Sequence, residues 1–82
     1  MTAKVLFFSL LRDLSGVEHV ELEVPDDGVR VDVLLEQLYQ KWPDMRAWDS
    51  KILVAAELDY VGRDTLVMPG QEVAVMPPVQ GG

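Results

Sequence analysis

The last six residues of the chain are the ones whose types and order could do chemistry. They read Pro77-Pro78-Val79-Gln80-Gly81-Gly82. Each proline fixes φ and lacks a backbone donor, so this stretch is extended and cannot continue a sheet ladder. The two glycines carry no Cβ and can pass through a channel too narrow for other residues. A stiff stalk with a thin tip indicates a C-terminus that is used as a chemical group.

The group at that tip is the α-carboxylate of Gly82. A free α-carboxyl has a pKa of about 3.3–3.7, so it is ionised at neutral pH and is a poor electrophile. Fully extended, residues 79–82 would reach about 13 Å beyond Pro78. Gly82 is therefore the predicted reactive residue, and residues 77–81 are predicted to pass into the active sites of partners.

The composition argues against several other classes of function. The chain has no cysteine, which excludes disulfides, thiolate metal sites and cysteine nucleophiles. Its one histidine, His19, has no second histidine or cysteine with which to bind a metal, so we predict no metal site. A net charge of −7 argues against nucleic acid and membranes as partners. It favours docking on basic protein surfaces, unless the charge serves only solubility.

The first half of the chain predicts a β-hairpin followed by a helix. The apolar run over residues 4–11 predicts a strand buried on both faces or nearly so. After a connection over residues 12–16, the alternation over residues 17–24 predicts a strand with one polar face. Apolar residues then recur at helical spacing over 31–42, and Pro43 is expected to end that helix. No apolar run reaches the roughly 20 residues of a membrane span and no signal-peptide pattern is present, so we expect a soluble, cytoplasmic domain.

The second half predicts a linker and three further strands. The linker over residues 43–50 has room for one short helical turn, and residues 51–58 predict a central or doubly covered strand. A short strand follows at Tyr60-Val61, and Pro69-Gly70 predicts a type II turn. The last strand runs to Met76 and leads into the tail. One helix across a four- or five-stranded sheet makes an α+β domain over residues 1–76, with 77–82 as its tail.

These features together resemble one known family. The apolar start followed by Arg12-Asp13, the helix after Val31, the Pro69–Val73 turn and strand, and the ending PPVQGG are similar to MoaD-like sulfur carriers, the small subunits of molybdopterin synthase. The resemblance covers essentially the whole chain and implies the β-grasp (ubiquitin-like) fold, with the first and last strands side by side. Two departures touch local geometry: Glu57 stands where asparagine is frequent, and the helix lacks the usual threonine or serine cap.

The resemblance also implies a reaction. An ATP-dependent activating enzyme adenylates Gly82, sulfur displaces AMP, and the tail becomes a thiocarboxylate. The thiocarboxylate then donates sulfur to cyclic pyranopterin monophosphate, a precursor in molybdenum cofactor biosynthesis. The small subunit has no catalytic side chains and no permanently bound cofactor, and two small subunits assemble with two large ones.

Candidate interface residues come from apolar or charged positions that one core cannot absorb. They are Met76, Phe7, Phe8, Arg12 and Tyr60. Phe7, Phe8 and Leu10 cannot all face one core, so we expect some of them at a partner surface, although a doubly covered first strand would account for them equally well. Three other functions stay open: a thiamin-type sulfur carrier, a ubiquitin-like protein modifier conjugated through Gly82, and a plain binding domain whose terminus has no role.

Overall fold

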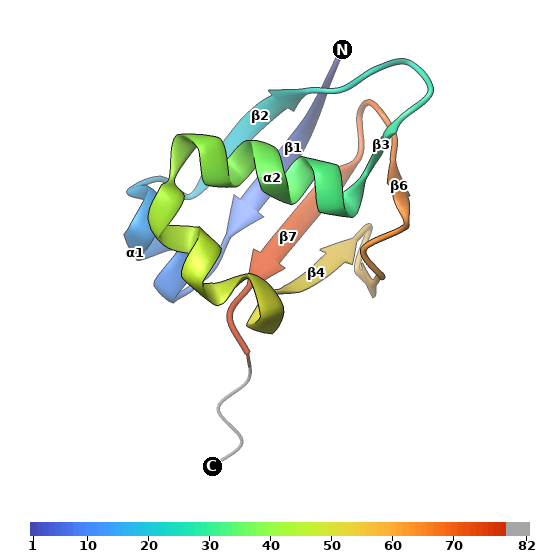
Figure 1. Ribbon diagram of the computed structural model, residues 1–82. Helices are drawn as coiled ribbons and strands as arrows, with labels where there is room; N and C mark the ends of the chain where they lie inside the picture. The colour runs from blue at the N-terminus through green and yellow to red at the C-terminus, as the bar shows by residue number, and fades with distance from the viewer. Residues whose placement is uncertain (79–82) are drawn as a thin grey trace.

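The computed structural model describes residues 1–78 of the chain (Figure 1). In order, its elements are β1 (Thr2–Phe7), α1 (Leu10–Ser15), β2 (His19–Glu23), β3 (Val29–Arg30), α2 (Val31–Lys41), the 3₁₀ helix η1 (Pro43–Lys51), β4 (Leu53–Ala56), β5 (Asp59–Tyr60), β6 (Leu66–Val67) and β7 (Glu72–Met76). Five strands form one sheet in the order β2-β1-β7-β4-β5, and β3 pairs with β6 in a separate two-stranded ribbon. Helix α2 lies across one face of the sheet (Figure 1).

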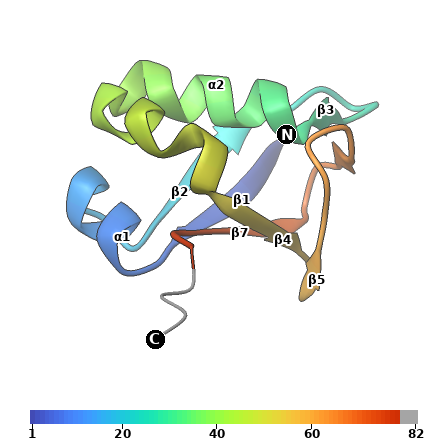
Figure 2. The ribbon, with the colours of Figure 1, turned by 60° about the horizontal axis from the view of Figure 1, so that its bottom comes forward.

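The first and last strands of the sheet are neighbours, as predicted. β1 and β7 pair in parallel, with Val5 opposite Val73, and β4 pairs with the other edge of β7 in antiparallel orientation. β7 is therefore the middle strand of five and is hydrogen-bonded on both sides. This topology confirms the β-grasp prediction. It also means that the chain leaving Met76 starts from the centre of the sheet (Figure 2).

The core lies between α2 and the face of the sheet that α2 covers. Every second side chain of a strand points towards α2, and the apolar stripe of α2 points towards the sheet. The apolar residues of both are therefore buried where helix and sheet meet. The completely buried members with the largest side chains are Leu11, Leu34, Leu35, Leu38, Met45, Val5, Val31, Val67, Val73 and Val75. At one end of this core the rings of Phe7 and Trp42 pack edge to face, with their centroids 5.2 Å apart.

The prediction for the first strand is wrong in its length and coverage, whereas β4 is an interior strand of the sheet, as one of the two alternatives predicted. β1 ends at Phe7, and residues 10–15 form α1 instead of continuing the strand or making a loop. Burial along β1 alternates, and Leu53 of β4 is exposed, so neither strand is covered on both faces. The physical reason is that one face of the sheet carries the core under α2 and η1, which lie on the same side (Figure 2), so only every second residue of β1 is buried. The helical part of the linker is also longer than the one short turn predicted, because η1 spans nine residues.

The N-cap residue of α2, Arg30, makes no side-chain cap, as the sequence predicts, and the first two backbone donors of the helix are satisfied by another segment. The N–H groups of Val31 and Asp32 donate to the carbonyl oxygens of Thr65 and Arg63, both at 2.9 Å. The β5–β6 connection therefore accepts hydrogen bonds that an N-cap side chain would otherwise accept. Among the described helices, none combines the length and apolar character needed to cross a membrane.

Candidate functional site

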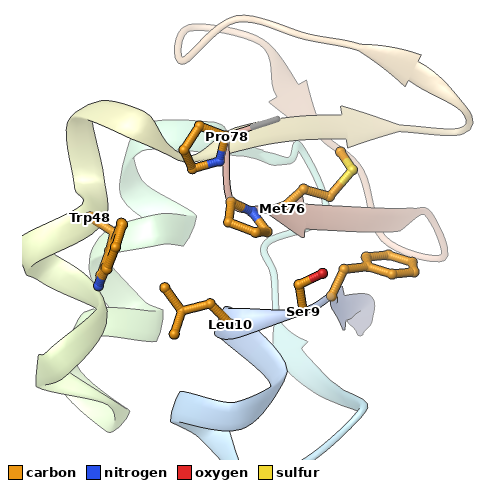
Figure 3. A pocket seen from close by; sticks show the side chains of 7 residues that line it. Ser9, Leu10, Trp48, Met76 and Pro78 are labelled. Atoms are coloured by element: carbon orange, nitrogen blue, oxygen red, sulfur yellow. The ribbon is translucent and has the colours of Figure 1, made fainter. Parts of the chain in front are cut away.

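The base of the tail lies in an apolar hollow where the chain leaves β7. The hollow has a volume of about 540 Å³ and is lined by Phe8, Ser9, Leu10, Trp48, Met76, Pro77 and Pro78. All of these residues except Ser9 are apolar. Figure 3 shows Leu10 from the start of α1 and Trp48 from η1 as walls of the same hollow, with Pro78 beside them. We call these seven residues the tail-base pocket.

A strained turn builds one wall of the tail-base pocket. The N–H of Leu11 donates to the carbonyl of Phe8 at 3.1 Å, which closes a four-residue turn. Ser9 has φ 52° and ψ −125°, the first central position of a type II′ turn, which glycine normally occupies. This turn stops β1 after Phe7 and starts α1 at Leu10. It therefore brings Phe8 and Leu10 to the tail instead of into a longer strand.

We expect Ser9→Gly to stabilise the domain. A side chain in this region of φ and ψ costs about 1–3 kcal/mol, and part of the gain is offset by the greater freedom of glycine in the unfolded chain. Urea unfolding should therefore show a rise of about 1 kcal/mol in the free energy of unfolding. Ser15→Gly is the matched control: Ser15 lies in α1, where glycine costs stability. A lower free energy of unfolding for Ser9→Gly than for the wild-type chain would contradict the inference that Ser9 is strained.

The opposite wall, η1, is held by a polar cluster of three residues. The hydroxyl of Tyr39 on α2 donates to Oδ1 of Asp49, and Arg63 donates to the same oxygen at 3.1 Å. Arg63 also donates to the carbonyl of Ile52 at 3.3 Å. Burial, and then the Asp49 carboxylate, raise the pKa of Tyr39, whereas the Tyr39 hydrogen bond and Arg63 lower the pKa of Asp49. The cluster fixes the element that carries Trp48.

The lowered pKa of Asp49 predicts an acid-sensitive contribution to folding. A depressed folded-state pKa adds stability above the unfolded pKa of about 3.9, and that stability is lost as the pH falls through the folded value. Melting temperatures measured from pH 7 down to pH 2 should therefore fall less for Asp49→Asn than for the wild-type chain. Asp44→Asn changes an exposed carboxylate of the same 3₁₀ helix and should keep the wild-type profile. Equal acid losses for Asp49→Asn and wild type would contradict this role.

The structure brings together only some of the predicted site residues. Met76 and Phe8 line the tail-base pocket beside Pro77 and Pro78, and the Phe8 side chain is 45% exposed. Phe7 is 2% exposed and belongs to the core, so its prediction as an interface residue is corrected. The reason is strand alternation: neighbouring residues of β1 point to opposite faces, and α2 covers only one of them.

The remaining predicted residues lie outside the tail-base pocket. Arg12 is exposed on α1. Tyr60 is 71% exposed on the edge strand β5, opposite Ala55 of β4. Val79, Gln80, Gly81 and Gly82 lie outside the described residues.

The open face of the sheet continues from the tail-base pocket. One row of paired residues crosses four strands, with Leu6 opposite Ala74, Ala74 opposite Ala55, and Ala55 opposite Tyr60. Paired residues of neighbouring strands point to the same side, so this row forms a band of mostly apolar surface. Met76 and Phe8 extend the band to the base of the tail. A surface of this kind on a small domain is typical of a protein interface.

Sequence reasoning missed Trp48 as a member of the site, and it considered Leu10 only as part of the first strand, together with Phe7 and Phe8. The apolar run predicts Leu10 within a strand, and Trp48 lies in the segment that we expected to be a linker. Trp48 carried a usable signal, because it is the one aromatic residue in the segment PDMRAWDS. The position of Leu10 depends on the backbone conformation of Ser9, and the spacing of apolar residues does not predict that conformation.

Comparisons with known proteins agree with this geometry. Residues 5–82 match the model of the ThiS family. The molybdopterin synthase sulfur carrier subunit of Haemophilus influenzae is 37% identical over 81 residues, which cover 95% of this chain and 96% of that protein. A Pyrococcus furiosus structure described as a candidate subunit 1 of molybdopterin converting factor superposes with a TM-score of 0.84 at 30% identity, covering 96% of this chain and 99% of that one.

A second solved structure shares the fold alone. The small archaeal modifier protein 1 of Methanosarcina acetivorans superposes with a TM-score of 0.84 at 23% identity, covering 99% of this chain and 96% of that one. Its likeness adds support for the β-grasp arrangement and does not separate carriers from modifiers. The family match spans nearly all of the sequence, including its last residue. The chain belongs to the ThiS family.

Proposed function

We propose that this chain is the sulfur-carrier subunit of a molybdopterin synthase. The observation that carries the proposal is the placement of the tail: a Pro-Pro stalk leaves the middle strand of the sheet inside an apolar pocket, and the sequence ends in Gly81-Gly82. The central strand holds the base of the tail rigidly, and the apolar rim offers a surface on which a partner can dock. The 37% identity to a sulfur carrier subunit supports the same conclusion.

The proposed chemistry takes place at the carboxylate of Gly82. The carboxylate attacks ATP on an activating enzyme, which releases pyrophosphate and leaves an acyl adenylate. A sulfur nucleophile then displaces AMP, and the product is a C-terminal thiocarboxylate. In the large synthase subunit the sulfur passes to cyclic pyranopterin monophosphate, and hydrolysis returns the carboxylate. The chain itself holds no cofactor in this scheme, and ATP is consumed by the activating enzyme.

The proposed assembly contains two small and two large subunits, and it works in the cytoplasm, where ATP is available. The open sheet face supports such an assembly because four tail residues alone bury too little surface. A stable protein interface buries about 800 Å² on each partner. The apolar band and the tail-base pocket supply the additional area next to the tail.

Intact-mass spectrometry tests the function. The chain is incubated with its activating enzyme, ATP and a sulfur donor, and is then mixed with the large subunit and the pterin precursor. We expect the mass change for replacement of one oxygen by sulfur, followed by its reversal when precursor is converted. No exchange of oxygen for sulfur would refute every carrier function. Isopeptide adducts through Gly82, without a complex with a large subunit, would instead favour a protein modifier.

A further inference from the structure

The tip of the β4–β5 hairpin is an unusual feature that the sulfur chemistry does not explain. Its two loop residues, Glu57 and Leu58, have φ values of 49° and 75°. Two positive values in a two-residue hairpin loop define a type I′ turn, for which Asn-Gly is the preferred pair. A branched apolar residue in this conformation is strained, so the fold alone would favour a different residue here.

Leu58 is also the most exposed large apolar side chain of the described part of the chain. It is 98% exposed, so it makes almost no contact with the domain that carries it. A leucine that contributes nothing to the core, at a backbone position that disfavours it, has no role in stability. Its chemistry suits insertion into an apolar pocket of another molecule.

Two carboxylates lie beside this leucine. Glu57, Leu58 and Glu72 line a hollow of about 120 Å³ with apolar residues of the sheet, among them Ala74. The N–H of Glu57 donates to the carbonyl of Glu72 at 3.1 Å, which holds the two residues together. Among residues 1–78, neither carboxylate takes part in an ion pair. The hollow therefore offers an apolar floor with negative charge at its rim.

The hairpin tip is continuous with the surface that surrounds the tail. Phe8 lines both this hollow and the tail-base pocket, so one partner can cover the two together. The chain carries a net charge of −7, and unpaired carboxylates in an interface attract a cationic partner surface. A partner that stays bound needs more contact area than the tail supplies. Of the proposed partners, the large synthase subunit is the one that must remain assembled with the chain.

We propose that the β4–β5 hairpin tip is a docking element for the large subunit, which receives Leu58 in an apolar pocket and places a lysine or arginine against Glu57 and Glu72. The inference rests on the proposed function, since it names the surface by which the same partner is recognised. It assigns Leu58 a role in affinity and the two carboxylates a role in the rate of association.

Leu58→Gly separates docking from folding. Glycine adopts the positive φ without strain, so this variant should melt at a higher temperature than the wild-type chain. It removes the exposed side chain, so its Kd for the large subunit, measured by titration calorimetry, should rise about tenfold. Opposite changes in stability and affinity cannot come from unfolding. Val33→Ala is the control, because Val33 is exposed on α2, away from the sheet face, and its Kd should stay at the wild-type value.

Charge reversal tests the carboxylates. Glu57→Lys/Glu72→Lys should lower the association rate with the large subunit about tenfold at low salt, and added salt should reduce the difference. Asp26→Lys/Asp27→Lys changes the net charge equally, in the loop before β3, and should keep a rate close to wild type. The control separates a local contact from a general effect of charge.

The outcomes distinguish this inference from the proposed function. If wild-type chain binds the large subunit and donates sulfur while Leu58→Gly and the double lysine variant bind equally well, the docking role of the hairpin tip is refuted and the carrier function stands. If wild-type chain binds no large subunit, both are refuted. Weaker binding by the variants of this hairpin, with the two controls unchanged, supports the docking element.

Discussion

Gly82→Ala is expected to abolish sulfur loading of the chain without changing its fold. In the function that we propose, two partner active sites must place the terminal carboxylate against ATP and then against a sulfur nucleophile or a pterin precursor. A methyl group on residue 82 widens a tip that is narrow because neither Gly81 nor Gly82 has a side chain. A displacement of about 1 Å at a reacting group costs on the order of 100-fold in rate. Thiocarboxylate formed per minute, read by intact mass, should therefore fall about 100-fold or more.

The matched control for this variant is Gly62→Ala. Gly62 lies in the β5–β6 connection, where an added Cβ would come 3.1 Å from the end of the Asp64 side chain, which can move aside. We expect wild-type loading from this variant and wild-type melting temperatures from both. Normal loading and normal precursor conversion by Gly82→Ala would refute the narrow-channel argument for the tail.

Phe7→Ala is expected to destabilise the domain severely. The ring is buried in the core and packs edge to face on Trp42. Removal of a buried phenylalanine side chain costs about 3–5 kcal/mol, because apolar contacts are lost and a cavity remains. Small domains have a total stability of about 5–15 kcal/mol, so much of it would be lost. Urea unfolding followed by tryptophan fluorescence should show this change as a lower midpoint.

Phe8→Ala provides the comparison at the adjacent residue. Phe8 is on the other side of the strand, at the tail-base pocket, so its removal should cost less than about 1 kcal/mol of stability. Its Kd for the large subunit should rise, because an exposed aromatic beside the tail is an anchor for a docked partner. Equal losses of stability for the two variants would contradict the assignment of Phe7 to the core and Phe8 to the surface.

Most of the fold could be predicted because its signals are local. The stripe over residues 31–42 repeats at helical spacing, and α2 occupies Val31–Lys41. Proline at position 43 disfavours helical geometry at the residue before it, and the helix ends there as expected. Pro69-Gly70 forms the expected turn, with Gly70 at φ 87° and a hydrogen bond from the N–H of Gln71 to the carbonyl of Met68. Each of these signals affects only residues that are a few positions away in the sequence.

The errors arose where the outcome depends on contacts between distant segments. Residues 4–11 are mostly apolar, and the strained turn at Ser9 divides them into a strand and a helix. The two-residue strands β3 and β6 are too short to show a period. Glu57 has a positive φ, a backbone conformation in which asparagine is enriched, and no pattern in the sequence indicates that conformation.

By itself, the sequence predicted the chemistry proposed for the carboxylate of Gly82, and it determined the main elements, one amphipathic helix and the alternating strands. These follow from residue types and their spacing, which act locally. The tertiary structure alone decided which of Phe7 and Phe8 faces the core, which carbonyls cap α2, and which side chains surround the base of the tail. Those outcomes depend on the uncovered face of the sheet and on contacts between distant segments, such as residues 63–65 with the start of α2. The spacing of residue types along the sequence does not specify such contacts.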